Sequence, residues 1–360
     1  NVYGVDNLQE VIDFLEGKGT LEPTTIDTRA EFYKTLDFPE FDFSDVKGQE
    51  SIKRCMEIAA AGGHNIILIG PPGAGKTMLA KRLPSILPPM TLREALETTK
   101  IHSVAGKLKE VGLMNQRPFR SPHHTISNVA LVGGGSYPQP GEISMAHNGV
   151  LFLDELPEFK RDVLEVMRQP LEDREVTISR AKFTVTYPSS FMLVASMNPS
   201  PSGFFNDPDS PQTSSPHEMQ RYLSKISGPL LDRIDIHIEV TPVPFEKLSD
   251  DRKAESSVDI RKRVTSAREI QTIRFEQMEN IHYNAQMNTK HIREYCALDD
   301  VSKQLLKTAM ERLNLSARAY DRILKVARTI ADLDAAPNVI SSHIAEAIQY
   351  RSLDRDGWLG

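Results

Sequence analysis

A glycine-rich segment that ends in lysine and threonine is the strongest chemical signal in this chain. It reads Gly-Pro-Pro-Gly-Ala-Gly-Lys-Thr and fits the pattern G-x-x-x-x-G-K-[ST] in full. Glycines let backbone N–H groups wrap a phosphate without a Cβ clash, Lys76 can reach the β- and γ-phosphates, and Thr77 can offer its hydroxyl to Mg²⁺. The segment predicts a site for ATP and Mg²⁺, with nucleotide contacts from Gly70, Pro71, Pro72, Gly73, Ala74, Gly75, Lys76, Thr77 and Met78.

The residues around this segment supply the setting that phosphate binding needs. An apolar run at 65–69 predicts a buried strand before it, and 78–83 predicts a helix after it. A helix N-terminus carries partial positive charge and favours a phosphate. Pattern and context agree, which makes a chance glycine-rich turn the weaker interpretation.

Two carboxylates follow a second buried strand, predicted at 150–153. Ligands in open α/β sheets bind beyond the carboxyl ends of the strands. We therefore expect Asp154 to hold Mg²⁺ and Glu155 to orient and deprotonate the attacking water. The alternative is an acidic helix cap, and the phosphate loop in the same chain favours the catalytic interpretation.

A third strand, predicted at 191–196, leads to Asn198. In a parallel sheet this end lies next to Asp154, so Asn198 is predicted to hydrogen-bond the γ-phosphate or the water. The alternative is a turn started by the Asn-Pro pair.

Two arginines are candidates for contacting a triphosphate from elsewhere in the chain. Arg233 stands just before a fourth predicted strand and could neutralise charge on a neighbouring subunit's ATP. A surface ion pair with Asp232 or Asp235 is an equal alternative. Arg318 opens a predicted helix, where a solvated arginine is equally compatible and Arg322 is the competing choice.

The order of patterns predicts a P-loop α/β fold. Strands alternate with helices as far as residue 240, which implies a parallel sheet covered on both faces, and only helical patterns follow residue 244. We divide the chain into an upstream tail and linker (1–27), an ATPase core (28–244) and an all-α lid (245–360). Because the chain does not begin with Met, we expect it to be a fragment of a longer protein.

Composition narrows the class of protein. The 360 residues are 39% hydrophobic and 26% charged, which suits a globular protein with a core. No apolar run approaches the roughly 20 residues that cross a bilayer. Only Cys55 and Cys296 occur, which excludes a disulfide framework and a four-thiolate zinc site and is typical of the reducing cytoplasm. With a net charge of −6, any DNA binding must be local.

Longer strings in the chain resemble the magnesium-chelatase-like AAA+ ATPases of the ComM/YifB type. They lie at 117–125 (RPFRSPHHT), 140–159, 227–235 and 350–354. The resemblance implies membership of the helix-2-insert clade, with the insert around 117–146. It also implies a missing Lon-protease-like N-terminal domain, of which residues 1–27 would be the tail and linker.

The same resemblance assigns roles that the residues alone left open. Arg233 matches the arginine finger and Arg318 the second sensor, which implies sites shared between subunits of a ring, with six subunits expected. A hairpin is implied at 176–187, with Arg180 and Lys182 near its tip. These two and Arg174 are candidates for salt-sensitive contacts to a DNA backbone.

The chain departs from the family where a cluster of cysteines usually follows the sensor asparagine. Serines stand at 200, 202 and 214 instead, and hydroxyls are poor zinc ligands. We therefore expect no metal beyond Mg²⁺. We expect His123 and His124 to make polar contacts, not to bind zinc. The charges at 261–263 and Arg268 are typical of a solvated helix face. For Phe204 and Phe205 the sequence leaves two roles open, local packing or contact with a partner.

Three functions are compatible with this resemblance. The first is a branch-migration helicase that acts on single-stranded or branched DNA in natural transformation and recombination. The second is a chelatase-type ATPase that drives metal insertion into a tetrapyrrole. The third is an ATP-binding regulatory scaffold, which the intact Glu155 disfavours.

Overall fold

The chain folds into two compact units, residues 1–37 and 38–360. The computed structural model describes residues 3–19, 21–23, 32, 41–108, 112–180, 183–201, 215–244, 254–278 and 281–351. In the first unit residues 8–15 form helix α1 (Leu8–Leu15), which begins after Asn7 because that side chain accepts a hydrogen bond from the Glu10 N–H. Residues 202–214, which include Phe204 and Phe205, and Lys182 lie outside the described residues.

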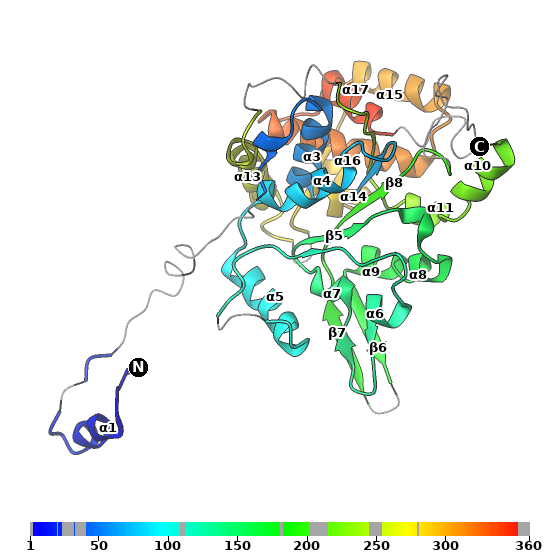
Figure 1. Ribbon diagram of the computed structural model, residues 1–360. Coiled ribbons are helices and arrows are strands. Elements are labelled where there is room, and N and C mark those ends of the chain that lie inside the picture. Colours follow the sequence, from blue (N-terminus) through cyan, green and yellow to red (C-terminus); the bar gives the residue numbers. More distant parts are fainter. Residues whose placement is uncertain are drawn as a thin grey trace. The chain divides into compact units, whose positions relative to one another are not determined.

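A five-stranded parallel sheet organises the second unit (Figure 1). Its spatial order is β2-β5-β8-β1-β9. The strands are β1 (Ile66–Ile69), β2 (Phe119–Arg120), β5 (Val150–Leu153), β8 (Met192–Met197) and β9 (Ile236–Glu239). Four of these strands were expected close to these positions. The two-residue edge strand β2 was not, because it carries no periodic apolar pattern.

Successive side chains of β1, β5 and β8 enter two different cores. Ile66 and Leu68 of β1 join one hydrophobic cluster, whereas Ile67 and Ile69 join another. All four are at most 1% exposed. A strand alternates its side chains between the two faces of a sheet, so the apolar runs seen in the sequence report a sheet that is covered on both sides.

One face of the sheet is covered by helices from both ends of the second unit. Helix α3 (Glu50–Gly62) contacts β9 and also the long helices of the C-terminal half. Residues 254–351 therefore share a continuous core with the sheet, while the division at 244/245 stays a prediction. The elements on this face are η1 (Phe43–Asp45), α4 (Lys76–Arg82), η2 (Leu83–Ile86), α13 (Ser257–Arg274), η4 (Asn284–Gln286), α14 (Thr289–Tyr295), α15 (Asp300–Arg312), α16 (Ala317–Leu333) and α17 (Ser341–Gln349).

The other face is covered by shorter helices, from which two hairpins extend (Figure 1). The hairpins are β3–β4 (Gly133–Gly134 and Gln139–Pro140) and β6–β7 (Glu175–Ser179 and Thr184–Pro188), the second lying where it was expected. The helices between and around them are α5 (Leu92–Val104), α6 (Asn128–Val132), α7 (Glu142–Met145), η3 (Leu156–Glu158), α8 (Arg161–Glu165), α9 (Arg168–Asp173), α10 (Pro216–Leu223) and α11 (Gly228–Leu231).

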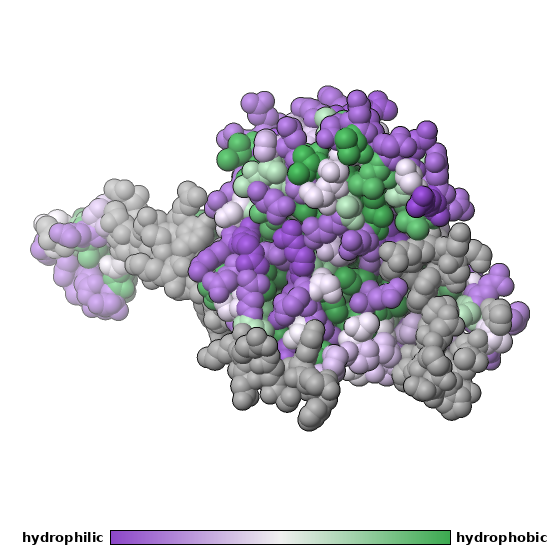
Figure 2. Space-filling model, turned by 90° about the horizontal axis from the view of Figure 1, so that it is seen from above, coloured by the Kyte–Doolittle hydropathy of each residue, from purple (hydrophilic) through white to green (hydrophobic). Residues whose placement is uncertain are grey.

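On the face drawn in Figure 2, the coloured residues are more often hydrophilic than hydrophobic, and hydrophobic areas lie between the hydrophilic ones. Within the described part of the chain, no helix has both the length and the apolar character needed to cross a bilayer.

A buried polar cluster joins the lid helices to the sheet. The His64 ring hydrogen-bonds Asp235 through Nδ1 (3.1 Å) and Thr329 of α16 through Nε2 (2.8 Å). Arg322, also on α16, donates to Asp235 at 2.9 Å. Burial acts to raise the pKa of Asp235, but the Arg322 charge and the His64 hydrogen bond outweigh it and hold that pKa below its usual range. The paired carboxylate fastens α16 to the residues just before β9.

Glycine at position 62 leaves the space that this cluster occupies. A Cβ there would lie 2.1 Å from His64 Nε2 and 2.5 Å from Thr329 Oγ1. We expect Gly62→Ala to lower the free energy of unfolding by roughly 1–3 kcal/mol, as overpacking does, in urea titrations followed by circular dichroism. Gly228→Ala is the matched control, because a Cβ there meets nothing within 4 Å. Equal stability of the two variants would contradict the packing argument.

Candidate nucleotide-binding site

The phosphate loop lies at the carboxyl ends of the central strands. It begins where β1 ends, and the Gly70 N–H donates to Met197 O of β8 at 3.1 Å. A Cβ at Gly70 would come within 2.2 Å of Val240 O. Gly73 and Gly75 have φ of 79° and 90°, a backbone region that glycine adopts without strain. Glycine is thus required for close approach at position 70 and for backbone conformation at 73 and 75.

The Lys76 ammonium is held over this loop by three uncharged oxygens. It donates to Gly70 O (2.6 Å), Pro71 O (2.9 Å) and Asn198 Oδ1 (3.1 Å). Burial lowers the pKa of Lys76, and the charges of Asp154 and Glu155 offset this only in part. Since its bonded acceptors are neutral, the ammonium charge remains able to attract a phosphate.

Asp154 and Thr77 form the candidate Mg²⁺ site. The Thr77 hydroxyl donates to Asp154 Oδ2 at 2.8 Å, and the Ser196 hydroxyl donates to Asp154 Oδ1. Hydroxyl and carboxylate oxygens are the hard ligands that Mg²⁺ prefers. The donor set therefore fits the predicted ion.

Glu155 has an unusual backbone conformation. Its φ and ψ are 55° and 52°, the left-handed region, which costs a residue other than glycine about 1–3 kcal/mol. Its N–H donates to Ser196 Oγ at 3.2 Å. The side chain is 57% exposed, and Oε2 lies 3.8 Å from His124 Nδ1. The turn thus presents the carboxylate to solvent next to the Asp154 site.

Asn198 completes the group of residues at this edge of the sheet. Its side-chain oxygen binds Lys76, and its backbone oxygen accepts a hydrogen bond from the hydroxyl of Tyr222 on α10 at 3.1 Å. The structure therefore brings together five predicted residues, namely Lys76, Thr77, Asp154, Glu155 and Asn198.

Ser196 and Tyr222 escaped the sequence analysis, and His124 was named there without its neighbour Glu155. Ser196 is the last residue but one of β8, beside β5, so the same rule that selected Asn198 could have found it. His124 and Tyr222 come from segments distant in sequence, and no local pattern signals their approach to Glu155 and Asn198.

Arg233 lies at the opposite edge of the sheet. Asn65, the residue before β1, donates from its side chain to Arg233 O at 2.9 Å, and Ile66 pairs with Ile236. Arg233 is thus at the amino ends of strands whose carboxyl ends hold Gly70. Five residues of strand separate the two edges by about 16 Å at 3.3 Å per residue. Arg233 is not close to its own chain's phosphate loop.

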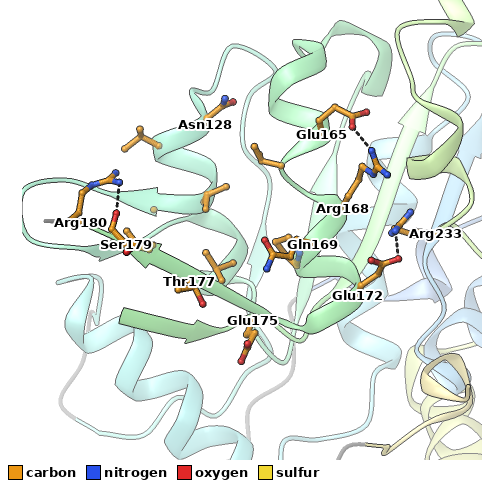
Figure 3. Close-up of a pocket in the computed structure, with 17 residues that line it drawn as sticks. Asn128, Glu165, Arg168, Gln169, Glu172, Glu175, Thr177, Ser179, Arg180 and Arg233 are labelled. Atoms are coloured by element: carbon orange, nitrogen blue, oxygen red, sulfur yellow. Dashed lines mark hydrogen bonds and ion pairs between the residues drawn. The ribbon is translucent and has the colours of Figure 1, made fainter. Parts of the chain in front are cut away.

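The arginine partners differ from those expected. Arg233 donates to Pro229 O at 2.5 Å and pairs with Glu172 of α9, as Figure 3 shows. The expected alternative partners, Asp232 and Asp235, are bound by other arginines. Arg318 pairs with Asp232, and Arg322 binds Asp232 O and the Asp235 carboxylate. Arg233, Arg318 and Arg322 therefore gather at one edge, away from Lys76.

The charged stretch on α13 is not simply a solvated face. Arg261 donates to Ser85 O and Arg268 to Ala60 O, while Arg263 pairs with Glu57 and Glu255. These side chains fasten α13 to α3 and η2, which a charge pattern in sequence cannot reveal. His123 Nδ1 hydrogen-bonds the hydroxyl of Thr125 at 2.9 Å. Over the described ranges, no group of three or more His, Cys, Asp or Glu side chains is arranged to hold a metal.

Comparison with known proteins decides the family. The profile described as "Magnesium chelatase, subunit ChlI" matches residues 42–248, and the one described as "Magnesium chelatase, subunit ChlI C-terminal" matches residues 254–351. The chain belongs to this family. Its parallel sheet flanked by helices, followed by a helical region, agrees with an AAA+ core and a magnesium-chelatase-type lid.

Relatives of the ComM/YifB type match this magnesium-chelatase-like AAA+ chain over nearly its whole length. YifB of Salmonella typhimurium is 46% identical over 351 residues, which cover 97% of this chain and 67% of YifB. Competence protein ComM of Haemophilus influenzae is 45% identical over 356 residues, which cover 99% of this chain and 69% of ComM. The ChlI subunit of Euglena gracilis is 23% identical over 192 residues, which cover 46% of this chain and 55% of that subunit. The chain thus spans about two thirds of ComM and YifB.

The geometry of the loop makes Lys76 the side chain to test first. We expect Lys76→Ala to abolish ATP binding, because no other described ammonium is held over the loop, as measured by fluorescence of a labelled ATP analogue. Lys81→Ala removes the same group from an exposed position on the same helix and should leave the affinity unchanged. Unchanged affinity in Lys76→Ala would remove the loop from nucleotide binding.

Proposed function

We propose that this chain is an ATP-hydrolysing motor whose active sites form between subunits of a ring, and that the ring acts on DNA. The observation that carries the proposal is the separation of two groups of residues. Lys76, Asp154 and Asn198 meet at the carboxyl edge of the sheet, whereas Arg233 and Arg318 lie at its amino edge.

Each residue at the carboxyl edge has a distinct task in hydrolysis. Backbone N–H groups of the loop and the Lys76 ammonium bind the β- and γ-phosphates. Thr77 and Asp154 would hold Mg²⁺, which offsets the negative charge of the phosphates when it is bound. Glu155 orients a water and takes its proton, and Asn198 hydrogen-bonds that water or the γ-phosphate. In-line attack by the water then releases phosphate and leaves ADP.

The arginines act on the ATP of a neighbouring subunit. The span between the two edges is about twice the reach of an extended arginine side chain of roughly 7 Å, so Arg233 cannot serve its own phosphate loop without unfolding the sheet. Head-to-tail contacts repeated around an axis bring one chain's amino edge to the next chain's carboxyl edge. Arg233 then exchanges Glu172 for the transferring phosphoryl group, and Arg318 approaches from the same side. We infer a hexameric ring.

Mixing of variants tests the shared site. Arg233→Ala and Asp154→Asn should each lack ATPase activity, while a mixture should recover some, because an intact loop then meets an intact arginine in about a quarter of randomly formed interfaces. Steady-state phosphate release measures this.

A matched mixture controls for other causes of recovery. Lys76→Ala and Asp154→Asn alter the same edge, so no interface between them contains a whole site. This pair should remain inactive. Recovery in both mixtures, or in neither after subunit exchange has been shown, contradicts the assignment of Arg233 to the neighbouring site.

DNA is the substrate that the relatives and the hairpin favour. ComM is named a competence protein, and proteins of its type are expected to drive branch migration on single-stranded or branched DNA. The β6–β7 hairpin carries Arg180 at its tip. Metal insertion into a tetrapyrrole is the second candidate. It is supported by the ChlI likeness, which at 23% identity over less than half of the chain is the weaker argument.

The response of the ATPase rate to DNA and to salt distinguishes these functions. We expect single-stranded or branched DNA to raise the ATPase rate severalfold at low salt, and this increase to fade as salt is added, because Arg180 contacts phosphates whose counterions are released on binding. The rate is measured with and without each DNA at several salt concentrations. A rate that ignores DNA at all of them would favour the chelatase-type motor, and ATP binding without turnover would favour the scaffold.

A further inference from the structure

The two hairpins form a single composite tip. The Tyr187 hydroxyl of β7 donates to Pro138 O at 2.9 Å, which links β6–β7 to the loop of β3–β4. A Cβ at Gly133 would lie 2.6 Å from the Ile178 side chain, and one at Gly134 would lie 2.9 Å from Arg180 Nη2. Both glycines also have positive φ, at 114° and 156°. The hairpins approach this closely only because neither residue has a side chain.

An exposed aromatic pair spans the composite tip. Tyr137 comes from the β3–β4 loop and is 75% exposed, and Phe183 comes from the β6–β7 turn and is 47% exposed. Their ring centroids are 6.3 Å apart and the planes are tilted by 36°. The two rings therefore touch one another while large parts of both remain open to solvent.

Cationic and hydroxyl groups continue from this pair. Arg180 is exposed and donates to Ser179 O at 3.0 Å. Behind it the exposed pairs Ser179–Thr184 and Thr177–Thr186 join their hydroxyls at 3.0 Å each. Figure 3 shows Thr177, Ser179 and Arg180 following one another along β6 toward the tip.

The β6–β7 hairpin is anchored to the rest of the molecule through one of its faces. Val176, Ile178 and Tyr187 alternate with the hydroxyls and are buried against the rest of the molecule. Between residues 176 and 188 the sequence contains two cations and no acid, and residues 133–140 carry no charge. The hydroxyl rows therefore face away from the anchored side, whereas Arg180 and the two rings lie at the end of the hairpin on the side of the β3–β4 hairpin.

We infer that Tyr137 and Phe183 form a stacking platform for unpaired bases of a single nucleic-acid strand, with Arg180 contacting its backbone. This inference deepens the proposed function and rests on it. Aromatic faces accept any base, and cations bind phosphate without reading sequence. A duplex hides its base faces, so the platform selects a single strand and tolerates any sequence.

Truncation of the two rings tests the platform. We expect the double variant Tyr137→Ala, Phe183→Ala to bind a labelled oligo(dT) roughly 5- to 150-fold more weakly, because it loses stacking on at least one base. Fluorescence anisotropy measures the affinity. Tyr137→Phe and Phe183→Tyr keep the rings and should bind like the unaltered chain. ATPase activity without DNA should not change.

Two further variants separate stacking from charge and from general exposure. Arg180→Ala should reduce the slope of log affinity against log salt by about one phosphate contact, whereas the double alanine variant should leave that slope unchanged. Ile273→Ala, at a side chain that is also 75% exposed but lies on α13, should alter neither.

The possible outcomes distinguish this inference from the proposed function. An unaltered chain that binds neither oligo(dT) nor branched DNA removes DNA as the substrate, and the platform with it. If the unaltered chain and the double alanine variant bind equally tightly, the stacking platform is rejected and DNA remains the proposed substrate. A double variant that loses ring assembly in sedimentation, while its subunits still bind oligo(dT) normally, would assign the pair to a subunit contact instead.

Discussion

The parallel register of β1, β5 and β8 is the constraint on which the rest of the structure depends. Because Leu153 pairs with Ala195 and Ile69 pairs with Met197, the polar residues that follow each strand emerge at the same edge. There the Lys76–Asn198 and Thr77–Asp154 hydrogen bonds join three connections that are distant in sequence. A slip of one residue in any strand would reverse its buried faces and disperse this group.

The same sheet separates the two halves of the proposed catalytic machinery. Asn65 binds the residues before β9 at one end of β1, and Gly70 begins the phosphate loop at the other. The hydrogen bonds among His64, Asp235 and Arg322 then join helix α16 to the amino edge of the sheet. Arg318 and Arg322 are both carried by α16, so the same helix holds two of the three arginines at this edge.

Several features could be predicted because they depend on local sequence. The glycine pattern specifies a loop conformation, and the apolar runs at β1, β5 and β8 specify buried strands, so the five residues of the nucleotide edge were found together. The edge strand β2 was missed, because a strand of two residues is too short to show an alternating pattern of apolar and polar side chains. The ion pair that was the alternative for Arg233 is not the one that forms. Asp232 and Asp235 are near Arg233 in sequence, yet Glu172 binds it because α9 and the residues before β9 meet only after folding.

The sequence by itself determined which residue types stand at the carboxyl edge of the sheet, the two-sided burial of the sheet and the family, since each rests on residue type and short spacing. Only the tertiary structure decided which edge each arginine occupies, which acid pairs with it, and that Tyr137 meets Phe183 across two hairpins. Such contacts join segments tens of residues apart. Their geometry follows from strand register and packing, which no single segment encodes.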